Sequence, residues 1–276
     1  MEAKKVCVIT GAAGVLPSAF ATEMVKNGYA VALLDRNAEG AEALAARIRA
    51  EGGTAAAYPC DVLDKASLQA AHEKMLAELG PATVLINGAG GNSPRATAAN
   101  ETFTAGDETR EDVATFFNLD KAGFEFVFNL NILGTLLPTQ VFTPDMVGKK
   151  GCSVLNISSM NAFRPLTKIP AYSAAKAGVS NFTQWLAVYF APAGIRVNAI
   201  APGFFVTAQN KALLFHEDGT PTPRTGKILA ATPMGRFGKP EELLGALRFF
   251  TDDSASGFVT GVVLPVDGGF AAYSGV

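Results

Sequence analysis

The sequence predicts a doubly wound α/β fold, in which helices cover both faces of one parallel sheet. Short runs of Val, Ile and Leu recur without polar alternation, as in strands that are buried on both faces. Segments with helical spacing and good helix formers lie between these runs, so the order reads βαβαβ. Of the 276 residues, 49% are hydrophobic and 17% are charged. That is enough apolar material for one domain over residues 1–276, built around a sizeable core.

The expected elements alternate along the chain. We expect strands at Val6–Ile9, Ala30–Leu34, Thr83–Ile86, Ser153–Ile157, Arg196–Ile200 and Val262–Val266. We expect helices at Glu39–Ala50, Lys65–Leu79, Ala174–Phe190 and Glu241–Phe250. Two connections are unusually long, from Gly88 to about Arg110 and from Phe204 to Thr232. Long connections in a compact domain are usually functional, and we expect both at the carboxyl ends of strands, where open α/β sheets bind ligands.

Helix boundaries are marked by particular residues. Gly52 and Gly53 follow the first of these helices, as expected for a helix end. Pro240 precedes Glu241 and Glu242, and this order suits a helix first turn and the positive end of its dipole.

Composition excludes several classes of partner. The 23 Lys and Arg against 25 Asp and Glu give a net charge of −2, which argues against a nucleic-acid or anionic-membrane surface. The cysteines are Cys7, Cys60 and Cys152, an odd number in apolar surroundings, so a disulfide framework is not expected. No signal peptide is evident, and apolar runs are far shorter than the roughly 20 residues that span a bilayer. We expect a cytoplasmic protein.

The first predicted strand leads into a glycine-bearing turn at the start of a helix, residues 10–17. Such a turn offers backbone N–H groups and the helix dipole to a pyrophosphate. Asp35 closes the second strand 24 residues after Gly11, where a carboxylate can bind both ribose hydroxyls and repel a 2′-phosphate. This favours NAD over NADP, although Arg36 could embrace a 2′-phosphate. The alternative is an ordinary turn followed by a surface aspartate.

A second cluster joins Tyr172, Lys176 and Ser159. Tyr172 and Lys176 are four residues apart in a predicted helix, so both side chains lie on one face. Ser159 stands thirteen residues before Tyr172, directly after an apolar strand. A cation beside a phenol favours the ionised phenol, so the pair suits general acid–base catalysis. Alternatively, these residues are a tyrosine at a subunit contact, a solvated lysine and a serine at a strand end.

With these motifs the sequence resembles the short-chain dehydrogenase/reductase family over nearly the whole chain. The matching segments are TGAAGVLP, Asp61-Val62 after a third strand, Asn87-Gly88-Ala89-Gly90, Asn131 within NILGTLLPTQ, Asn156-Ile157-Ser158-Ser159, YSAAK, Ile195-Arg196-Val197-Asn198, Pro202-Gly203 and Val266-Asp267-Gly268-Gly269. The resemblance implies a Rossmann-type fold and an oxidoreductase that acts on CH-OH groups. In one departure, Val15 and Pro17 stand where the family's second and third glycines fall. Gly14 is expected to take over the close approach to the pyrophosphate, with Pro17 tolerated at a helix N1 position.

The resemblance also implies roles for individual residues. Tyr172 would be the general acid/base, Lys176 would favour its phenolate, Ser159 would fix the reacting oxygen, and Asn131 would hold a water that passes protons towards Lys176. The residues implied at the cofactor, together with Tyr172 and Lys176, are Gly11, Gly14 and Leu16 at the phosphates, Asp35 with Arg36 at the adenosine ribose, Asp61 and Val62 at the adenine, Asn87, Gly88 and Ala89 beneath the ribose, and Pro202, Gly203, Phe205 and Thr207 around the carboxamide. No metal is required, and His72 and His216 do not form a ligand cluster.

A closer resemblance is to the D-mannonate oxidoreductase, or fructuronate reductase, branch of the family. It rests on INGAGGNSPRAT, SSMNAFRPLTKIPAYSAAK and the terminal VDGGFAAYSGV, among other segments. It implies a sugar-acid substrate, whose carboxylate and hydroxyls need cationic or amide contacts. Candidates for these contacts are Arg95, Asn161, Arg164 and Lys168. The family resemblance further implies a homo-oligomer, often a tetramer, for which the apolar tail Phe270–Val276 is either an interface or a packed end of the core.

Two other functions stay open at this point. The same scaffold serves reductases of other polyols, ketoses or 3-oxoacyl thioesters. A protein with an altered glycine turn could also be an NAD-binding sensor without turnover, although Ser159, Tyr172 and Lys176 speak against this.

Overall fold

The chain folds around one seven-stranded sheet. The computed structural model describes residues 5–207 and 211–275. Its strands are all parallel and lie in the order β3-β2-β1-β4-β5-β6-β7. Their bounds are Val6–Thr10 (β1), Ala30–Asp35 (β2), Ala55–Pro59 (β3), Ala82–Asn87 (β4), Cys152–Ile157 (β5), Ile195–Pro202 (β6) and Val263–Val266 (β7). The strand order reverses between β1 and β4, which opens a crevice at their carboxyl ends. The predicted doubly wound fold is confirmed.

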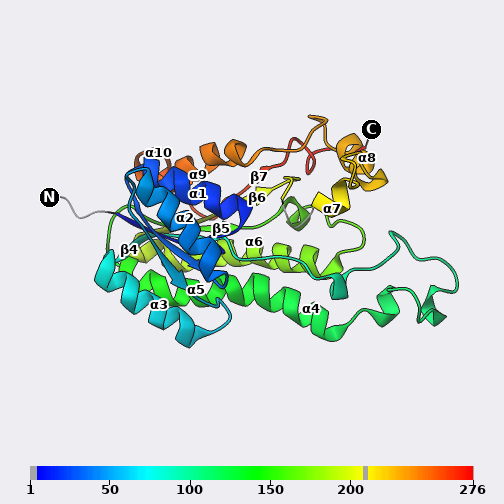
Figure 1. Cartoon of the computed structure of the whole chain (residues 1–276), viewed down its shortest axis with the longest axis horizontal. Coiled ribbons are helices and arrows are strands. Elements are labelled where there is room, and N and C mark those ends of the chain that lie inside the picture. The colour runs from blue at the N-terminus through cyan, green and yellow to red at the C-terminus, as the bar shows by residue number, and fades with distance from the viewer. Residues whose placement is uncertain (1–4, 208–210, 276) are drawn as a thin grey trace.

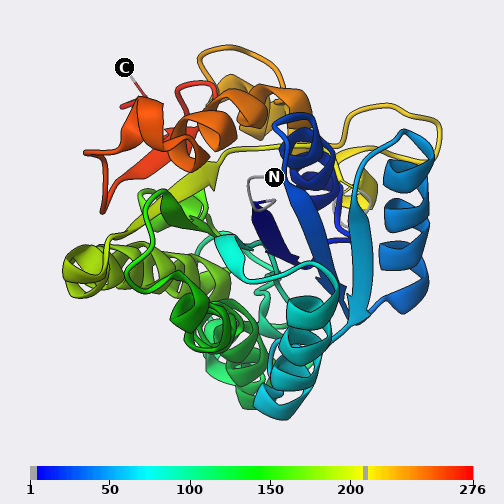
Figure 2. The same ribbon diagram turned by 90° about the vertical axis from the view of Figure 1, so that its left-hand side faces the viewer.

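Helices cover both faces of this sheet (Figure 2). One layer contains α3 (Lys65–Glu78), α5 (Gly134–Phe142) and α6 (Pro170–Phe190), and the other contains α1 (Val15–Lys26), α2 (Ala38–Ala50) and α9 (Leu244–Thr251). Successive side chains of a strand point to opposite faces. In β1, Val6 and Val8 therefore pack in the core beneath the first layer, whereas Cys7 and Ile9 pack beneath the second.

The strand β3 does not appear among the predicted runs of Val, Ile and Leu. Its sequence is AAAYP, and it pairs with β2 from Ala55 opposite Val31 to Pro59 opposite Asp35. As an edge strand, it needs few large apolar side chains and tolerates a proline. The family resemblance, which places Asp61 after a third strand, indicated this strand where the apolar pattern did not.

Two helices begin differently from the prediction. α6 starts at Pro170, four residues before the expected Ala174, so Tyr172 is the third residue of the helix. Pro170 is suited to the first helical position because its fixed φ matches the helix. The helix predicted at Glu241 opens instead with a 3₁₀ turn, η8 (Pro240–Leu243), and continues as α9.

The two long connections carry structure of their own. The first extends to Asp120 and contains three 3₁₀ turns, η1 (Pro94–Ala96), η2 (Asp107–Thr109) and η3 (Phe116–Asn118). The second contains the short helices α7 (Lys211–Leu214) and α8 (Pro223–Ala230). In Figure 1, α7 and α8 lie at the same end of the molecule as the loop that precedes α4 (Lys121–Phe128). Both connections thus gather beyond the carboxyl ends of the strands.

One helical stretch, Lys121–Met146, is long and apolar enough to cross a membrane when judged by length and composition. It runs from α4 through the π-helical turn η4 (Asn129–Leu133) into α5 and the 3₁₀ turn η5 (Thr143–Met146). Half of its most apolar window is buried inside the protein. Such burial is typical of a core helix, and Phe142 of this stretch is part of the core beneath the sheet.

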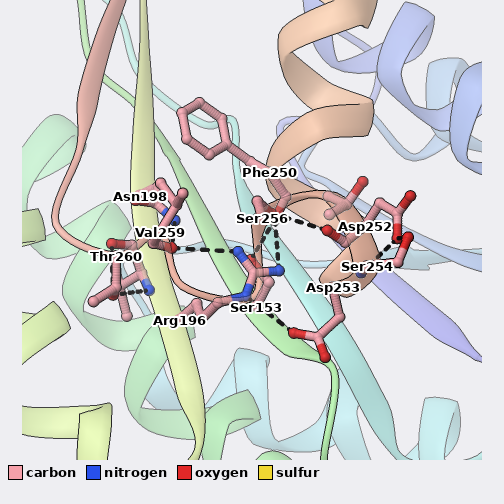
Figure 3. A network of polar contacts seen from close by, with 12 residues as sticks. Ser153, Arg196, Asn198, Phe250, Asp252, Asp253, Ser254, Ser256, Val259 and Thr260 are labelled. Carbon is pink, nitrogen blue, oxygen red and sulfur yellow. Dashed lines mark hydrogen bonds and ion pairs between the residues drawn. The ribbon is translucent and has the colours of Figure 1, made fainter.

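A polar network fixes the last part of the chain to the sheet (Figure 3). Arg196, at the start of β6, is 7% exposed, and its Nη2 donates to the Phe250 carbonyl oxygen over 3.0 Å. The Ser153 hydroxyl of β5 donates to the same oxygen over 3.1 Å. Arg196 Nε lies 3.3 Å from Asp253 Oδ1. These contacts hold the end of α9 against two strands and so position the turn that leads into β7.

Candidate active site

The glycine turn after β1 comes into close contact with the end of β4. Gly11 has a φ of +65°, and a Cβ built on it would lie 2.9 Å from the Ala89 Cα. Thr10 Oγ1 accepts hydrogen bonds from the backbone N–H groups of Gly88 (3.1 Å) and Ala89 (3.2 Å). Only glycine fits at position 11, because any side chain would push these two backbone segments apart. The two sequence-predicted segments, the turn at Gly11 and the loop at Gly88 and Ala89, therefore lie together.

The departures from the family's glycine pattern are accommodated at the start of α1. Gly14 is the N-cap of this helix, and its carbonyl accepts from the N–H of Ser18 over 2.9 Å. Pro17 is the third helical residue rather than the first, but the N–H at that position also has no partner within the helix, so proline removes no hydrogen bond. A Cβ on Gly88 would lie 2.9 Å from Pro17 Cγ. The proline ring thus packs against the β4 loop.

Asp35 is fixed beside the glycine turn. Its Oδ2 accepts from the Ala13 N–H (2.9 Å), and its Oδ1 accepts from the Asn37 N–H (2.8 Å). Each carboxylate oxygen can accept a further hydrogen bond. Arg36 Nη1 is 4.0 Å from Asp61 Oδ2, so the guanidinium already has a carboxylate beside it. This arrangement leaves Arg36 less suited to a 2′-phosphate than an unpaired arginine would be.

Asp61 and Val62 follow β3 at the same edge of the sheet. Asp61 Oδ1 accepts from the Leu63 N–H over 2.9 Å. Val62 is buried and packs against Gly134, whose added Cβ would lie 3.2 Å from Val62 Cγ2. Asn87 lies at the end of β4, but its side chain points into the protein. Its Nδ2 donates to Asn156 Oδ1 (2.8 Å) and Thr139 Oγ1 (3.0 Å), so its contribution at the sheet edge comes from its backbone.

Ser159, Tyr172 and Lys176 come together at the carboxyl end of β5. Ser159 follows this strand and precedes the 3₁₀ turn η6 (Met160–Ala162), and its side chain hydrogen-bonds that of Tyr172. Tyr172 and Lys176 are one turn apart on α6, and Lys176 Nζ lies 5.7 Å from the centre of the Tyr172 ring. Lys176 is 4% exposed, and its Nζ donates to the Ile157 carbonyl oxygen over 2.7 Å. The lysine is thereby aimed at the strand end.

Burial controls the protonation of both groups. The pKa of Tyr172 is raised because burial disfavours the phenolate, and the hydrogen bond from Ser159 offsets part of this effect. Burial lowers the pKa of Lys176 to about 8, since its ammonium is removed from water. At neutral pH Tyr172 therefore carries its proton and Lys176 is positively charged. This is the protonation state of a general acid with a cation nearby.

Asn131 lies in the π-helical turn η4 and is fully buried. Its Nδ2 donates to the carbonyl oxygens of Val127 (2.7 Å) and Gly91 (2.8 Å). A Cβ on Gly90 would lie 2.8 Å from Asn131 Oδ1 and 3.0 Å from Lys176 Nζ. The bare backbone of Gly90 therefore separates Asn131 from Lys176, and the two predicted residues face the same small space. π-Helical turns inside α-helices frequently occur at functional sites.

The segment after β6 lies against the segment after β7. A Cβ on Gly203 would lie 2.5 Å from the Asp267 Cα, and Gly203 N–H donates to the Val266 carbonyl oxygen over 3.0 Å. Pro202 ends β6, Phe205 is buried, and Thr207 is the last residue described before the gap at 208–210. A cavity of about 400 Å³ adjoins these turns. Its lining residues include Phe205 and Asp267 but not Ser159, Tyr172 or Lys176, so it is separate from the tyrosine–lysine cluster.

The predicted substrate contacts differ in how they are placed. Asn161 is 4% exposed, and its N–H donates to Ser159 Oγ over 3.3 Å. Its side-chain oxygen is buried and has no hydrogen-bond partner among the described residues. Arg95 forms an ion pair with Asp120, and Arg164 donates from Nε to the Ala271 carbonyl oxygen over 2.9 Å. The structure thus brings Asn161 to Ser159, whereas both arginines have other partners.

Lys168 lies on the segment between Ser159 and α6. It has a φ of +72°, a conformation that L-residues rarely adopt. Its carbonyl oxygen accepts from the Ala98 N–H over 2.7 Å, which ties this segment to the first long connection. Strained backbone of this kind persists where the surrounding structure holds it, often at ligand sites.

The site also contains groups that the sequence did not reveal. The Ile157 carbonyl oxygen that accepts from Lys176 belongs to the backbone, so the residue type at position 157 does not predict this contact. Gly90 belongs to the Asn87–Gly90 match, so its presence was noted, but its place between Asn131 and Lys176 depends on the fold. An ion pair between Glu101 and Lys227 joins the two long connections, and neither residue belongs to a motif.

Metal-binding side chains are sparse in the described ranges 5–207 and 211–275. No group of three or more His, Cys, Asp or Glu side chains there could hold a metal ion. His72 Nε2 instead lies 3.0 Å from Asp145 Oδ2. The three cysteines are buried and unpaired, and burial raises the pKa of Cys60 to about 11. Neutral, buried thiols of this kind are poor metal ligands and poor nucleophiles.

Comparison with known proteins identifies the family. Residues 5–217 match the sequence profile of the short chain dehydrogenase family. An uncharacterized oxidoreductase of Haemophilus influenzae is 58% identical over 272 residues, covering 99% of this chain and 95% of that protein. A crystal structure from Haemophilus influenza with bound NAD, provisionally named a D-mannonate oxidoreductase, has a TM-score of 0.94 at 58% identity, covering 99% of this chain and 96% of that one.

A relative with lower sequence identity is named as a reductase of a sugar acid. The 5-keto-D-gluconate 5-reductase of Escherichia coli K12 is 34% identical over 267 residues, covering 97% of this chain and 95% of that protein. The matches extend over the glycine turn, the segment with Ser159 and the helix with Tyr172 and Lys176. The chain belongs to the short chain dehydrogenase family and is an oxidoreductase of alcohol and carbonyl groups that uses a nicotinamide cofactor.

Proposed function

We propose that the protein interconverts D-mannonate and D-fructuronate, with NAD as its cofactor. The observation that carries the reaction type is the cluster of buried Ser159 and Lys176 with partly buried Tyr172, in which Lys176 Nζ lies 5.7 Å from the centre of the tyrosine ring. Support for the sugar-acid substrate comes from the 58% identity to the Haemophilus influenza structure provisionally named a D-mannonate oxidoreductase, which contains NAD. The 34% identity to a 5-keto-D-gluconate 5-reductase is in keeping with the same substrate class.

The residues at the glycine turn fit a dinucleotide. Gly11 has no side chain where its backbone meets Ala89. α1 begins four residues later at Val15, and the first N–H groups of a helix have no partner within the helix. Gly14 and Leu16 would then lie along the phosphates, and Asp35 would accept from the ribose hydroxyls. Arg36, held near Asp61, is in keeping with a ribose without a 2′-phosphate. The other cofactor contacts are proposed at Val62, at the Asn87–Ala89 backbone, and at Pro202, Gly203, Phe205 and Thr207.

Side chains of the protein carry out the proton transfer. When bound, the nicotinamide supplies or accepts the hydride. Tyr172 Oη donates its proton to the substrate oxygen during ketone reduction and takes it back during alcohol oxidation. Ser159 holds that oxygen beside Tyr172, and the charge of Lys176 stabilises the phenolate left after proton donation. Asn131, across Gly90 from Lys176, positions a water that returns the proton from solvent.

The substrate contact best supported by the geometry is Asn161. Within ranges 5–207 and 211–275 its buried side-chain oxygen has no hydrogen-bond partner, and a buried acceptor of this kind is costly unless a ligand donates to it. A hydroxyl beside the reacting carbonyl of a sugar acid is such a donor. Asn161→Ala is expected to raise the KM for D-fructuronate while leaving the Kd for NADH unchanged. An unchanged KM removes Asn161 from the substrate site.

The protein is further proposed to be a cytoplasmic homo-oligomer, in the form of a tetramer. The outer face of α6 exposes Trp185 (56%), Val188 (78%) and Tyr189 (63%), and Trp185 and Tyr189 stack at 4.9 Å between ring centres. Exposed apolar patches of this kind commonly mark subunit contacts. Light scattering is expected to give the mass of four chains, and Trp185→Glu is expected to reduce it. A monomeric wild-type protein would contradict the proposal.

The experiment that tests the function is an initial-rate assay of the purified protein with NADH. D-fructuronate is compared with other keto-sugar acids, ketoses and 3-oxoacyl thioesters at equal concentration. The proposal predicts the highest kcat/KM with D-fructuronate. A higher value with another ketone keeps the reaction type and discards the substrate, whereas NADH binding without turnover of any ketone indicates a sensor.

A further inference from the structure

The two long connections are joined by an ion pair between Glu101 and Lys227. Lys227 Nζ lies 3.0 Å from Glu101 Oε1 and 2.9 Å from Oε2. Glu101 belongs to the connection after β4, and Lys227 lies on α8 in the connection after β6. Both connections leave the carboxyl edge of the sheet, where Ser159 also lies. Figure 1 shows α8 and the loop that precedes α4 at the same end of the molecule, beyond the carboxyl ends of the strands, where open α/β sheets bind ligands.

More than one cation lies near the Glu101 carboxylate. Lys227, Lys168 and Arg224 all hold the pKa of Glu101 below its usual range. Arg224 and Lys227 are three residues apart on α8 and share one face of it. Lys168 and Glu101 line the same cavity of about 290 Å³. Asp107 also lines this cavity, so three cations stand against two carboxylates and leave an excess of positive charge, which attracts anions.

The ion pair is exposed, so its partners can exchange at little cost. The side chains of Lys227 and Glu101 are 67% and 41% exposed. Ion pairs with this exposure contribute little to stability because water and salt screen them. A carboxylate on a ligand has the same chemistry as the Glu101 side chain and can replace it at Lys227.

We propose that Lys227 determines specificity by binding the carboxylate of an anionic substrate, and that Glu101 occupies this position when no substrate is bound. The inference rests on the proposed function, which gives the substrate a carboxylate. It assigns the carboxylate contact to α8 because two further cations, Lys168 and Arg224, act on the position that Glu101 occupies beside Lys227. Lys168 and Arg224 add to the attraction from either side.

Two single substitutions distinguish substrate binding by Lys227 from a purely structural role, in which the ion pair only holds the two connections together. Glu101→Gln removes the competing charge and is expected to lower the KM for D-fructuronate about two- to fivefold. Lys227→Met removes the binding cation and is expected to raise that KM by about the same factor. If the ion pair were purely structural, either substitution would break it equally, and both would shift the KM for D-fructuronate in the same direction. Both shifts are expected to shrink as salt is raised.

The experiment has two controls: a neutral ketose as substrate, and a substitution at another exposed lysine. Lys121→Met removes a different exposed cation, paired with Glu125, and is expected to leave KM unchanged. Opposite KM shifts with D-fructuronate, absent with the neutral ketose, support the inference. Shifts in the same direction, no shifts, or equal shifts with the neutral ketose overturn it. An enzyme that reduces only neutral ketones contradicts the proposed substrate as well, whereas D-fructuronate reduction with unaltered KM in both variants contradicts this inference alone.

Discussion

Lys176 Nζ lies 5.7 Å from the centre of the Tyr172 ring, and no carboxylate in the described part of the chain forms an ion pair with it. The Ile157 carbonyl oxygen, 2.7 Å away, is a neutral acceptor. The positive charge is therefore not cancelled locally, and it acts on the phenol one turn earlier. This arrangement stabilises a phenolate when Tyr172 releases its proton, at the expense of burying a cation.

Lys176→Met is expected to abolish most turnover and to stabilise the fold. Burial lowers the pKa of Lys176 from 10.5 to about 8, so between these values the unfolded chain binds more protons than the folded one, and stability rises with pH. Below about pH 8 the full penalty of burying the charge is present. Methionine removes it, which should raise the unfolding free energy at neutral pH by about 2 kcal/mol once the lost hydrogen bond is allowed for.

Denaturant unfolding at several pH values measures this effect. The advantage of the methionine variant should shrink as pH rises through 8 towards 10.5, because over this range the folded wild-type protein no longer holds a charged lysine. Lys121→Met, at a side chain that is 88% exposed, is the matched control and should change stability little. A methionine variant of Lys176 that is less stable than wild type at neutral pH would refute the account of this lysine.

The two directions of the reaction should respond oppositely to pH. Burial raises the pKa of Tyr172, so the phenol stays protonated through the neutral range and is ready to donate to a ketone. Alcohol oxidation needs the phenolate, and its kcat/KM should rise with pH, whereas reduction should be level near neutrality and fall in alkali. Initial rates in both directions at constant ionic strength measure this. An oxidation rate that declines as pH increases would argue against Tyr172 as the proton carrier.

Asp35→Asn should shift cofactor preference towards NADPH. The amide keeps an acceptor for the Ala13 N–H but removes the charge that repels a 2′-phosphate. The ratio of kcat/KM with NADPH to that with NADH is expected to increase by about tenfold or more. Arg36→Ala is the control and should leave the NADH value nearly unchanged, since Arg36 lies beside Asp61. If the asparagine variant keeps the wild-type ratio, Asp35 does not select the cofactor.

Gly11→Ala should weaken NADH binding far more than Gly28→Ala. Both glycines have positive φ values, +65° and +82°, so alanine costs about 1 kcal/mol of backbone strain at each. At Gly11 the new Cβ also meets the Ala89 backbone at 2.9 Å, whereas at Gly28 no atom of the described chain lies within 4 Å. Displacement of the turn should raise the NADH Kd about tenfold or more, as measured by fluorescence titration. Equal Kd values in the two variants would show that the close approach is not needed.

Much of the fold could be predicted because buried parallel strands are rich in Val, Ile and Leu. The pattern does not predict β3, because an edge strand with three alanines buries little apolar surface. It predicts the start of α6 four residues too late, because Pro170 resembles a loop residue. The path of the long connections could not be predicted. Their 3₁₀ turns and short helices depend on contacts such as Ala98 N–H to the Lys168 carbonyl, between residues far apart in sequence.

The site was predictable where side chains share one element. The four-residue spacing of Tyr172 and Lys176 requires only a helix, and the structure has that helix. Contacts across elements were not predictable. The pairing of Arg95 with Asp120 depends on how the first connection folds, so the sequence alone left Arg95 among the candidate carboxylate ligands. The hydrogen bond from Lys176 to Ile157 ends on a backbone oxygen, which leaves no mark in the sequence.

The most direct test of the central claim is Tyr172→Phe, assayed for D-fructuronate reduction and for NADH binding on the same preparation. The phenyl ring preserves the packing and removes only the hydroxyl that bonds Ser159. We predict that kcat falls at least about a thousandfold, as expected when a general acid is lost, while the NADH Kd stays within about twofold. Retention of wild-type kcat with normal NADH binding would contradict the claim that Tyr172 is the proton donor.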